Sequence, residues 1–201
     1  CGDGIIQNPN DALIPEICDD GNIVSGDGCS GTDKPAAQQC QVETGAICVS
    51  NPPPSQCLIM YWASDSSGVT HSPSSILQGT DAYAFFKGTM LPNSGSNFNS
   101  EIYEDDGIFG TDLVDPPGTF SVPVTTNAGI KVASYRWPSQ WTSDGLGDPE
   151  FFFQANLAGS NRKSNLLTVT KLAAGTYCGD GNVQNTVVTG SPNDDGQNEE
   201  C

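Results

Sequence analysis

The sequence has little positive charge. Seven Lys and Arg residues stand against 24 Asp and Glu residues, and the formal net charge is −17. Such a chain would repel phosphate groups, which excludes nucleic acids and anionic membrane surfaces as partners. The excess of carboxylates is compatible with bound Ca²⁺, since roughly two or three such ions would offset much of it. A solvated acidic surface that keeps the protein soluble is an equally good explanation.

Long apolar runs are also missing. No stretch approaches the roughly 18–20 residues that a membrane-spanning helix needs, so we expect no membrane insertion. The sequence has no initiator Met and no signal peptide, and it begins and ends with Cys. This pattern predicts a processed or truncated piece of a longer protein.

Residues typical of enzyme active sites are scarce. The single histidine, His71, lies in SSGVTHSPSS (66–75), which is more typical of a flexible or O-glycosylated loop than of a catalytic site. The motifs G-x-S-x-G and H-E-x-x-H are absent, as are glycine-rich phosphate loops. No pair of carboxylates is singled out for glycoside hydrolysis. We therefore expect no enzymatic activity.

Cysteines, in contrast, are present in an even number. All eight are predicted to form disulfides: Cys1, Cys18, Cys29, Cys40, Cys48, Cys57, Cys178 and Cys201. None has the C-x-x-C spacing typical of zinc or iron–sulfur sites, so disulfides in an oxidising compartment are favoured. We expect the protein to be extracellular or at the cell surface.

The cysteines divide the chain into three segments. Residues 1–57 contain six of them, residues 58–177 contain none but hold all three Trp and all eight Phe residues, and residues 178–201 contain the last two. The stretches SNPPPSQC (50–57) and GTYC (175–178) mark the boundaries. We expect a cysteine-rich segment (1–57), a sandwich segment (58–177) and the start of a second cysteine-rich repeat.

The cysteine-rich segment carries a series of spaced motifs. They are CGDG (1–4), CDDGN (18–22), GDGC (26–29) and CQVETGAIC (40–48). This series resembles the myxobacterial-type cysteine-rich repeat, an uncharacterised family of extracellular repeats in bacterial and protist surface proteins. The resemblance covers residues 1–48, although the spacers after Cys1 and Cys29 are longer than in the family pattern.

The cysteine-rich segment needs covalent support. It is too polar to offset, by burial alone, an ordering entropy of roughly 1–2 kcal/mol per residue. A disulfide that closes a loop of about 15 residues contributes on the order of 3 kcal/mol. Pairing of sequence neighbours is the working hypothesis, although other arrangements are open. These pairs would be Cys1–Cys18, Cys29–Cys40 and Cys48–Cys57.

The same segment is rich in oxygen ligands next to glycines. The predicted ligands of Ca²⁺ are Asp3, Glu16, Asp19, Asp20, Asn22 and Asp27. Hard oxygen ligands on a disulfide-pinned loop suit Ca²⁺, although the spacing is not that of an EF-hand. The alternative is that Asp and Asn only form turns by bonding to the local backbone.

The first heptapeptide recurs late in the chain. CGDGIIQ (1–7) returns almost unchanged as CGDGNVQ (178–184), and the residues up to Cys201 match those up to Cys18 in order. Residues 178–201 are therefore interpreted as part of another repeat, and Asp180 joins the predicted calcium ligands. Such repetition is typical of elongated proteins and favours a tandem array or an end-to-end assembly, although one flanking repeat would give the same pattern.

The sandwich segment has the pattern of an all-β domain. Seven short aromatic or β-branched runs are predicted strands: 58–63, 81–90, 100–105, 119–124, 130–137, 150–158 and 165–172. In TFSVPV, Phe120, Val122 and Val124 share one face, as in a half-buried strand. We predict an all-β fold: a seven- or eight-stranded antiparallel β-sandwich flanked by small, disulfide-rich, loop-dominated modules.

Some sandwich loops are acidic. TDAY (80–83) and YEDDGIFGTDLV (103–114) together are faintly similar to C2-type sandwiches, whose Ca²⁺ ions bind between two such loops. That similarity implies further calcium ligands, namely Asp81, Asp105, Asp106 and Asp112. A solvated acidic rim explains these residues equally well.

Two functions remain. The first is a structural repeating unit of an extracellular fibre, surface appendage or coat, stapled by disulfides, stiffened by calcium and assembling end to end with copies of itself. The second is an adhesion or carbohydrate-binding module, in which the sandwich loops or YRWPSQW (135–141) would hold surface glycans, although such aromatics are more often core residues. The repeated heptapeptide favours the first.

Overall fold

The computed structural model describes residues 1–10, 13–50, 53–70, 73–107, 110–114, 116–142 and 147–171. Within these ranges the regular secondary structure is almost entirely β, with twelve strands and a short 3₁₀ turn at Ala36–Gln38. The predicted all-β fold is confirmed. The residues predicted at 178–201, with Cys178, Asp180 and Cys201, lie outside the described ranges, as does His71. None of the described residues forms a helix that could cross a membrane.

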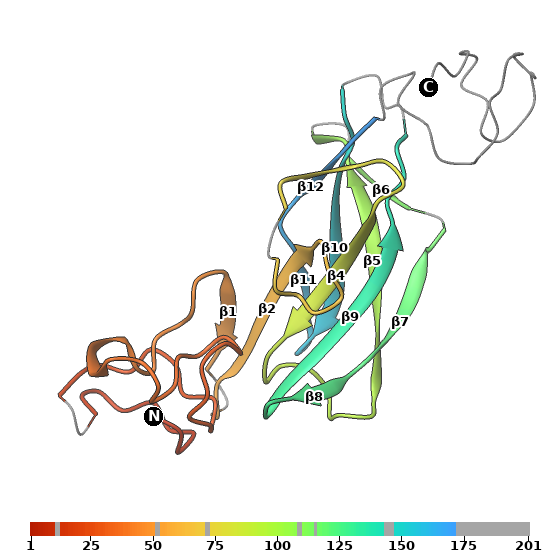
Figure 1. Cartoon of the computed structure of the whole chain (residues 1–201). Coiled ribbons are helices and arrows are strands. Elements are labelled where there is room, and N and C mark those ends of the chain that lie inside the picture. The colour runs from red at the N-terminus through yellow and green to blue at the C-terminus, as the bar shows by residue number, and fades with distance from the viewer. Residues whose placement is uncertain are drawn as a thin grey trace, which may run out of the picture.

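Two sheets make up the sandwich (Figure 1). The first has the order β1-β2-β4-β9-β8, with β1 at Ala46–Val49, β2 at Gln56–Ala63, β4 at Asp81–Lys87, β9 at Ile130–Pro138 and β8 at Thr125–Asn127. The second has the order β3-β12-β10-β5-β6, with β3 at Ser75–Leu77, β12 at Leu167–Thr170, β10 at Glu150–Leu157, β5 at Asn97–Asp105 and β6 at Thr111–Leu113. Off this path, β11 (Ser160–Lys163) pairs with β10 and β7 (Thr119–Pro123) pairs with β5. Neighbouring strands are antiparallel, except for the parallel pair β3–β12.

The seven predicted strands are present with small shifts at their ends, but the predicted number of seven or eight strands is too low. Five short strands were missed: β1, β3, β6, β8 and β11. In β6 and β8 every residue is exposed, and β11 is nearly so. A strand without a buried face has no alternation of apolar and polar residues, so the sequence pattern could not predict it.

Aromatic side chains from both sheets fill the core. Trp62 of the first sheet contacts Phe153 of the second edge-on, with ring centroids 4.9 Å apart. The Trp62 indole N–H donates to the Phe151 carbonyl at 3.2 Å, so its polar atom is satisfied although the side chain is fully buried. In β7, Phe120 and Val122 are buried while their neighbours are exposed, which confirms the predicted alternation. Burial of each such side chain contributes roughly 1.5–3 kcal/mol.

Disulfides hold the cysteine-rich segment, and two of the three expected pairs are wrong. The pairs are Cys1–Cys40, Cys18–Cys29 and Cys48–Cys57, so only the last matches the expectation. The backbone decides this pairing. The N–H groups of Ile17 and Cys18 donate to the Cys40 carbonyl, and the Cys1 amino group donates to Glu16, so Cys1 and Cys40 both lie beside residues 16–18. An isolated bridge between Cys29 and Val42 holds Cys29 where it reaches Cys18.

Strand β2 joins the cysteine-rich segment to the sandwich segment. It begins at Gln56, crosses the expected boundary at residue 57 and continues into the first sheet, beside the cysteine-rich segment in Figure 1. Its partner β1 lies wholly in the cysteine-rich segment, with Cys48 directly opposite Cys57. The disulfide therefore links cross-strand neighbours. Two further backbone bonds tie Cys57 to the sandwich: its N–H donates to Thr89 Oγ1, and its carbonyl accepts from Met90 N–H, each at 2.9 Å.

Candidate metal centre in the cysteine-rich segment

Among the described residues of the cysteine-rich segment four carboxylates are buried, which is unusual for a region with so little apolar surface. They are Glu16, Asp19, Asp20 and Asp27, all among the predicted calcium ligands. They form two groups. The first surrounds Cys1 and consists of Glu16 and Asp19, with Asp3 beside them, and the second consists of Asp20 and Asp27.

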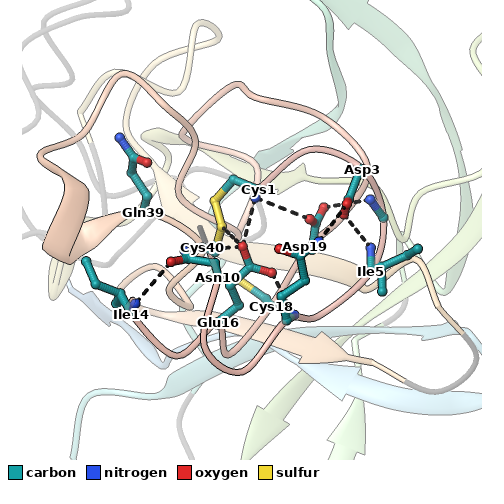
Figure 2. Close-up of polar contacts among 12 residues, drawn as sticks. Cys1, Asp3, Ile5, Asn10, Ile14, Glu16, Cys18, Asp19, Gln39 and Cys40 are labelled. Carbon is teal, nitrogen blue, oxygen red and sulfur yellow. Dashed lines mark hydrogen bonds and ion pairs between the residues drawn. A yellow bond between two sulfur atoms is a disulfide. The ribbon is translucent and has the colours of Figure 1, made fainter. Parts of the chain in front are cut away.

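Glu16 is the centre of the first group (Figure 2). Its Oε1 accepts from the amino group of Cys1 at 2.8 Å, and its Oε2 accepts from Gln7 N–H at 2.9 Å. The Asn10 amide donates to Oε1 at 3.4 Å. Both oxygens of this buried carboxylate are therefore taken by protein donors, which satisfies them without a metal ion.

Asp19 is also held by donors from the protein. Its Oδ1 accepts from the backbone N–H groups of Gly4 and Gly21, at 3.1 and 3.0 Å. Burial alone would raise the pKa of Asp19, but these hydrogen bonds favour the charged form, and the pKa lies below its ordinary value. Asp19 Oδ2 lies 3.7 Å from the amino group of Cys1. Asp19 is thus a stable anion within the fold.

Asp3 behaves as a turn former. It is exposed, and its two oxygens accept from Ile5 N–H and from the Gln7 side-chain amide, each at 3.0 Å. This is the local side-chain-to-backbone bonding that was the alternative to a metal ligand.

The second group differs in its counter-charge. Asp19 Oδ2 of the first group also accepts no hydrogen bond but has the amino group of Cys1 beside it, whereas two oxygens of the second group have neither a hydrogen bond nor an ion pair among the described residues. Asn22 bridges the pair: its backbone N–H donates to Asp20 Oδ1 at 3.4 Å, and its side-chain amide donates to Asp27 Oδ2 at 2.9 Å. The remaining oxygens, Asp20 Oδ2 and Asp27 Oδ1, are buried and accept no hydrogen bond. A buried carboxylate oxygen without a donor is costly, so this pair calls for a proton or a cation.

Glu43 fixes the loop that carries Asp27. Its carboxylate accepts from Gly26 N–H at 2.7 and 2.9 Å and from Gly28 N–H at 2.9 Å. The sequence prediction missed Glu43. Its signal was its place between Cys40 and Cys48, in the stretch CQVETGAIC that the repeat pattern includes.

Burial and mutual repulsion disfavour the charged forms of the pair. Burial, followed by the negative charge of Asp27, raises the pKa of Asp20 to about 7. Burial also raises the pKa of Asp27, and the charge of Glu43 adds to this effect. Of the ion pairs in the described part of the chain, none involves Asp20, Asp27 or Glu43. Two adjacent carboxylates without a counter-charge are suited to a hard divalent cation such as Ca²⁺.

The cysteines of the described residues do not form a site for a soft metal such as zinc or iron. Their two groups of three close ligand atoms are Cys18 with Cys48 and Cys57, and Cys1 with Glu16 and Cys40. Every sulfur in these groups belongs to a disulfide, so no thiolate is available to zinc or iron.

The acidic residues predicted in the sandwich loops do not gather in one place. Asp81 forms an exposed ion pair with Arg136 at 2.7 Å, on the first sheet. Asp105 and Asp112 lie on the second sheet, where Asp105 accepts from the Gly107 N–H in a local turn. Among the described residues, no three of these carboxylates, Asp106 included, come within 4.8 Å of one another.

The stretch YRWPSQW does not form an exposed aromatic platform. Trp137 lies in the core and is 1% exposed. Tyr135 stacks on Phe120 with ring centroids 3.8 Å apart. The Lys171 ammonium lies over the ring of the half-buried Trp141, 4.6 Å from its centroid. These aromatics stabilise the sandwich, as the more conservative interpretation of the sequence expected.

Comparison with protein families and curated proteins identifies no relative from which a function could be inferred. No protein-family model matches the chain, and no curated protein matches it at a significant level. The resemblance of residues 1–48 to a cysteine-rich repeat therefore stays a prediction.

Proposed function

We propose that this chain is a stiff structural unit of an extracellular fibre, surface appendage or coat. The observation that carries the proposal is the join between the two segments. Strand β2 belongs to both, and the cross-strand disulfide Cys48–Cys57 locks it to β1. Two domains connected by a flexible linker would have few contacts across the boundary, whereas here a continuous sheet crosses it.

Further contacts at the join support stiffness. Ser55 and Asp19 bond to each other twice: Ser55 N–H donates to the Asp19 carbonyl at 2.7 Å, and Asp19 N–H donates to Ser55 Oγ at 3.1 Å. On the sandwich side, a Cβ placed on Gly88 would lie 2.6 Å from the Asp27 carbonyl oxygen. The loop that carries Asp27 therefore lies directly against the end of β4.

The recurring heptapeptide supports assembly from such units. CGDGNVQ at 178–184 would begin a second cysteine-rich repeat behind the sandwich segment, so that stiff units follow one another in a tandem array or end to end. Three disulfides fit an oxidising compartment, and we propose an extracellular location or one at the cell surface. Calcium is proposed to stiffen the cysteine-rich segment further, since its buried carboxylate pair lacks a counter-charge.

Small-angle X-ray scattering tests the stiffness directly. The wild-type cysteine-rich and sandwich segments should scatter as one rigid elongated particle. The double variant Cys48→Ser/Cys57→Ser should scatter as two bodies on a hinge, with a larger radius of gyration. A wild-type curve that requires hinge motion would contradict the proposal.

Electron microscopy of negatively stained, concentrated protein tests assembly. Filaments or end-to-end oligomers are expected, and deletion of residues 178–201 should abolish them. Unimpaired assembly of the truncated chain would remove the role proposed for the second repeat. The alternative of a glycan-binding module has less support, because the aromatic stretch is occupied within the fold; selective binding on a glycan array would favour it.

A further inference from the structure

We infer that one Ca²⁺ ion binds between Asp20 and Asp27 and tightens the contact of the cysteine-rich segment with the sandwich segment. This inference deepens the proposed function and rests on it, since it assigns the stiffening ion to one pair of residues. It also separates this pair from the other predicted ligands.

The first step is the state of the carboxylate oxygens. Asp20 is 8% exposed and Asp27 is 2% exposed, and each has one buried oxygen that accepts no hydrogen bond. Asn22 holds the other oxygen of each side chain, which fixes both carboxylates in neighbouring positions. Glu16, in contrast, has donors on both oxygens. The Asp20–Asp27 pair therefore presents unused ligand atoms in a place that the fold has already shaped.

The second step is the missing counter-charge. Glu43 adds a third carboxylate beside the loop of residues 26–28, although no choice of one oxygen from each of Asp20, Asp27 and Glu43 brings all three within 4.8 Å of one another. Lys87 reaches the same loop, with its ammonium 3.3 Å from the position of a Cβ placed on Gly26, yet it forms no ion pair within 4.0 Å with any carboxylate of the described residues. Buried charge without a counter-charge is unfavourable, and a divalent cation removes that penalty for two carboxylates at once.

The third step is the identity of the ion. Oxygen is the only ligand atom that the pair and its surroundings offer, because the nearby sulfurs are in disulfides. Ca²⁺ accepts six to eight oxygen ligands in flexible geometry and draws freely on backbone carbonyls and water, whereas Mg²⁺ demands a near-ideal octahedron. Two carboxylates suit the weaker class of extracellular calcium sites, with Kd on the order of 10⁻⁴–10⁻³ M.

The fourth step is the position of the pair. The Asp27 carbonyl oxygen lies against Gly88 of the sandwich segment, and the neighbouring Gly28 lies against the Cβ of Cys57 in β2. Asp20 follows Asp19, whose backbone bonds to Ser55 just before β2. An ion held by Asp20 and Asp27 would thus connect the two loops that contact the start of β2.

Isothermal titration calorimetry of the metal-stripped full chain tests the site. CaCl₂ should bind with about one ion per chain in this affinity class. Asp27→Asn keeps the side-chain shape and should weaken binding at least tenfold, and Asp20→Asn should do the same. Asp33→Asn, which changes an exposed carboxylate of the same segment that is not a predicted ligand, is the matched control and should bind as wild type does. Wild-type affinity in both Asp20→Asn and Asp27→Asn, or no binding to the wild type at 5 mM CaCl₂, would overturn the inference.

Hydrogen exchange tests the tightening. Ca²⁺ should slow exchange of the Met90 amide, which donates to the Cys57 carbonyl across the boundary between the segments, at least several-fold in the wild type and not in Asp27→Asn. Unchanged exchange would overturn the inference, and a rigid scattering curve in the same metal-free sample would leave the proposed stiff unit intact. A hinged curve with and without Ca²⁺ would overturn both.

Discussion

Gly88 lies at the contact between the sandwich segment and the loop that carries Asp27. Its φ is +137°, a conformation that residues with a side chain rarely adopt. A Cβ at this position would lie 2.3 Å from the Cys57 carbonyl oxygen and 2.6 Å from that of Asp27. Both are backbone atoms, so neither can rotate away. The close approach of the two segments therefore requires glycine, which has no Cβ, at position 88.

Gly88→Ala should destabilise the protein by about 2–4 kcal/mol, because it adds a backbone clash to an unfavourable φ. The melting temperature should fall by roughly 5–15 °C, measured by scanning calorimetry. Gly79→Ala is the control, since its φ is also positive, at +79°, but a Cβ there meets nothing within 4 Å. An equal loss in the two variants would show that conformational strain, and not the contact between the segments, explains the effect.

Asp20 should make the metal-free protein less stable at higher pH. Its pKa is raised in the fold to about 7, against about 3.9 in an unfolded chain, so its contribution is fully present below pH 4 and is lost as the pH rises through 7. Asp20→Asn mimics the protonated form. In a chelator, urea unfolding should show the variant more stable than wild type at pH 8, by at most about 4 kcal/mol, with little difference at pH 4. A variant that is less stable than wild type at pH 8 would contradict this expectation.

At the scale of elements, disulfides and one strand organise the cysteine-rich segment. Apart from β1 and the start of β2, the described residues up to Cys57 form no strand, and a single 3₁₀ turn is their only helical element. With so little regular structure, this segment depends mainly on its disulfides, which close loops and thereby restrict the unfolded state. The loops differ in size: Cys1–Cys40 spans 39 residues of sequence, whereas Cys48–Cys57 spans 9.

Removal of the disulfide that closes the larger loop should lower the free energy of unfolding by the larger amount. In the chain-entropy estimate, Cys1→Ser/Cys40→Ser should destabilise the protein by about 4 kcal/mol and Cys48→Ser/Cys57→Ser by about 3 kcal/mol. Chemical unfolding of the two variants under non-reducing conditions measures both values. A peptide map of the unreduced wild type supplies the control, since it must recover Cys1 linked to Cys40. A larger loss in the Cys48–Cys57 variant would indicate that the join contributes more than loop closure does.

The seven principal strands were predictable because their buried positions are occupied by apolar and aromatic residues. β4 places Ala82, Ala84 and Phe86 on the face toward the core, and three consecutive Phe residues lie in β10. β6 and β8 have no buried residue, so only their neighbours in the sheet define them. The disulfide pairs were not predictable from order along the chain, because Cys40 is placed by backbone bonds from Ile17 and Cys18.

The candidate site was predictable in composition but not in detail. Asp and Asn beside glycine marked the right loops, yet the same pattern describes Asp3, which only forms a turn, and Asp20, which is buried with an unused oxygen. The difference lies in what packs around each carboxylate. That depends on Glu43, Cys57 and Gly88, which are distant in sequence.

At the scale of the whole molecule, the negative charge opposes the proposed assembly. Units with a formal charge of −17 repel one another, and the repulsion is screened over about 10 Å at 0.1 M salt. Self-association should therefore strengthen as NaCl is raised from about 20 to 200 mM, as measured by sedimentation velocity. CaCl₂ at equal ionic strength should act more strongly if ions bind the chain. Association that weakens with salt would indicate contacts between opposite charges and would contradict a repulsion-limited assembly.

The sulfur bridges also set how far the cysteine-rich segment can lengthen under tension. A pull between Cys1 and β2 passes through the bridge to Cys40, along residues 41–47, and through the bridge from Cys48 to Cys57. Only the stretch between Cys40 and Cys48 bears the load as free backbone, and at about 3.4 Å per residue its contour length is roughly 27 Å. The same segment without its bridges would reach roughly 190 Å. In a fibre of such units the oxidised cysteine-rich segment would be nearly inextensible, and a reducing environment would allow that segment to lengthen under load.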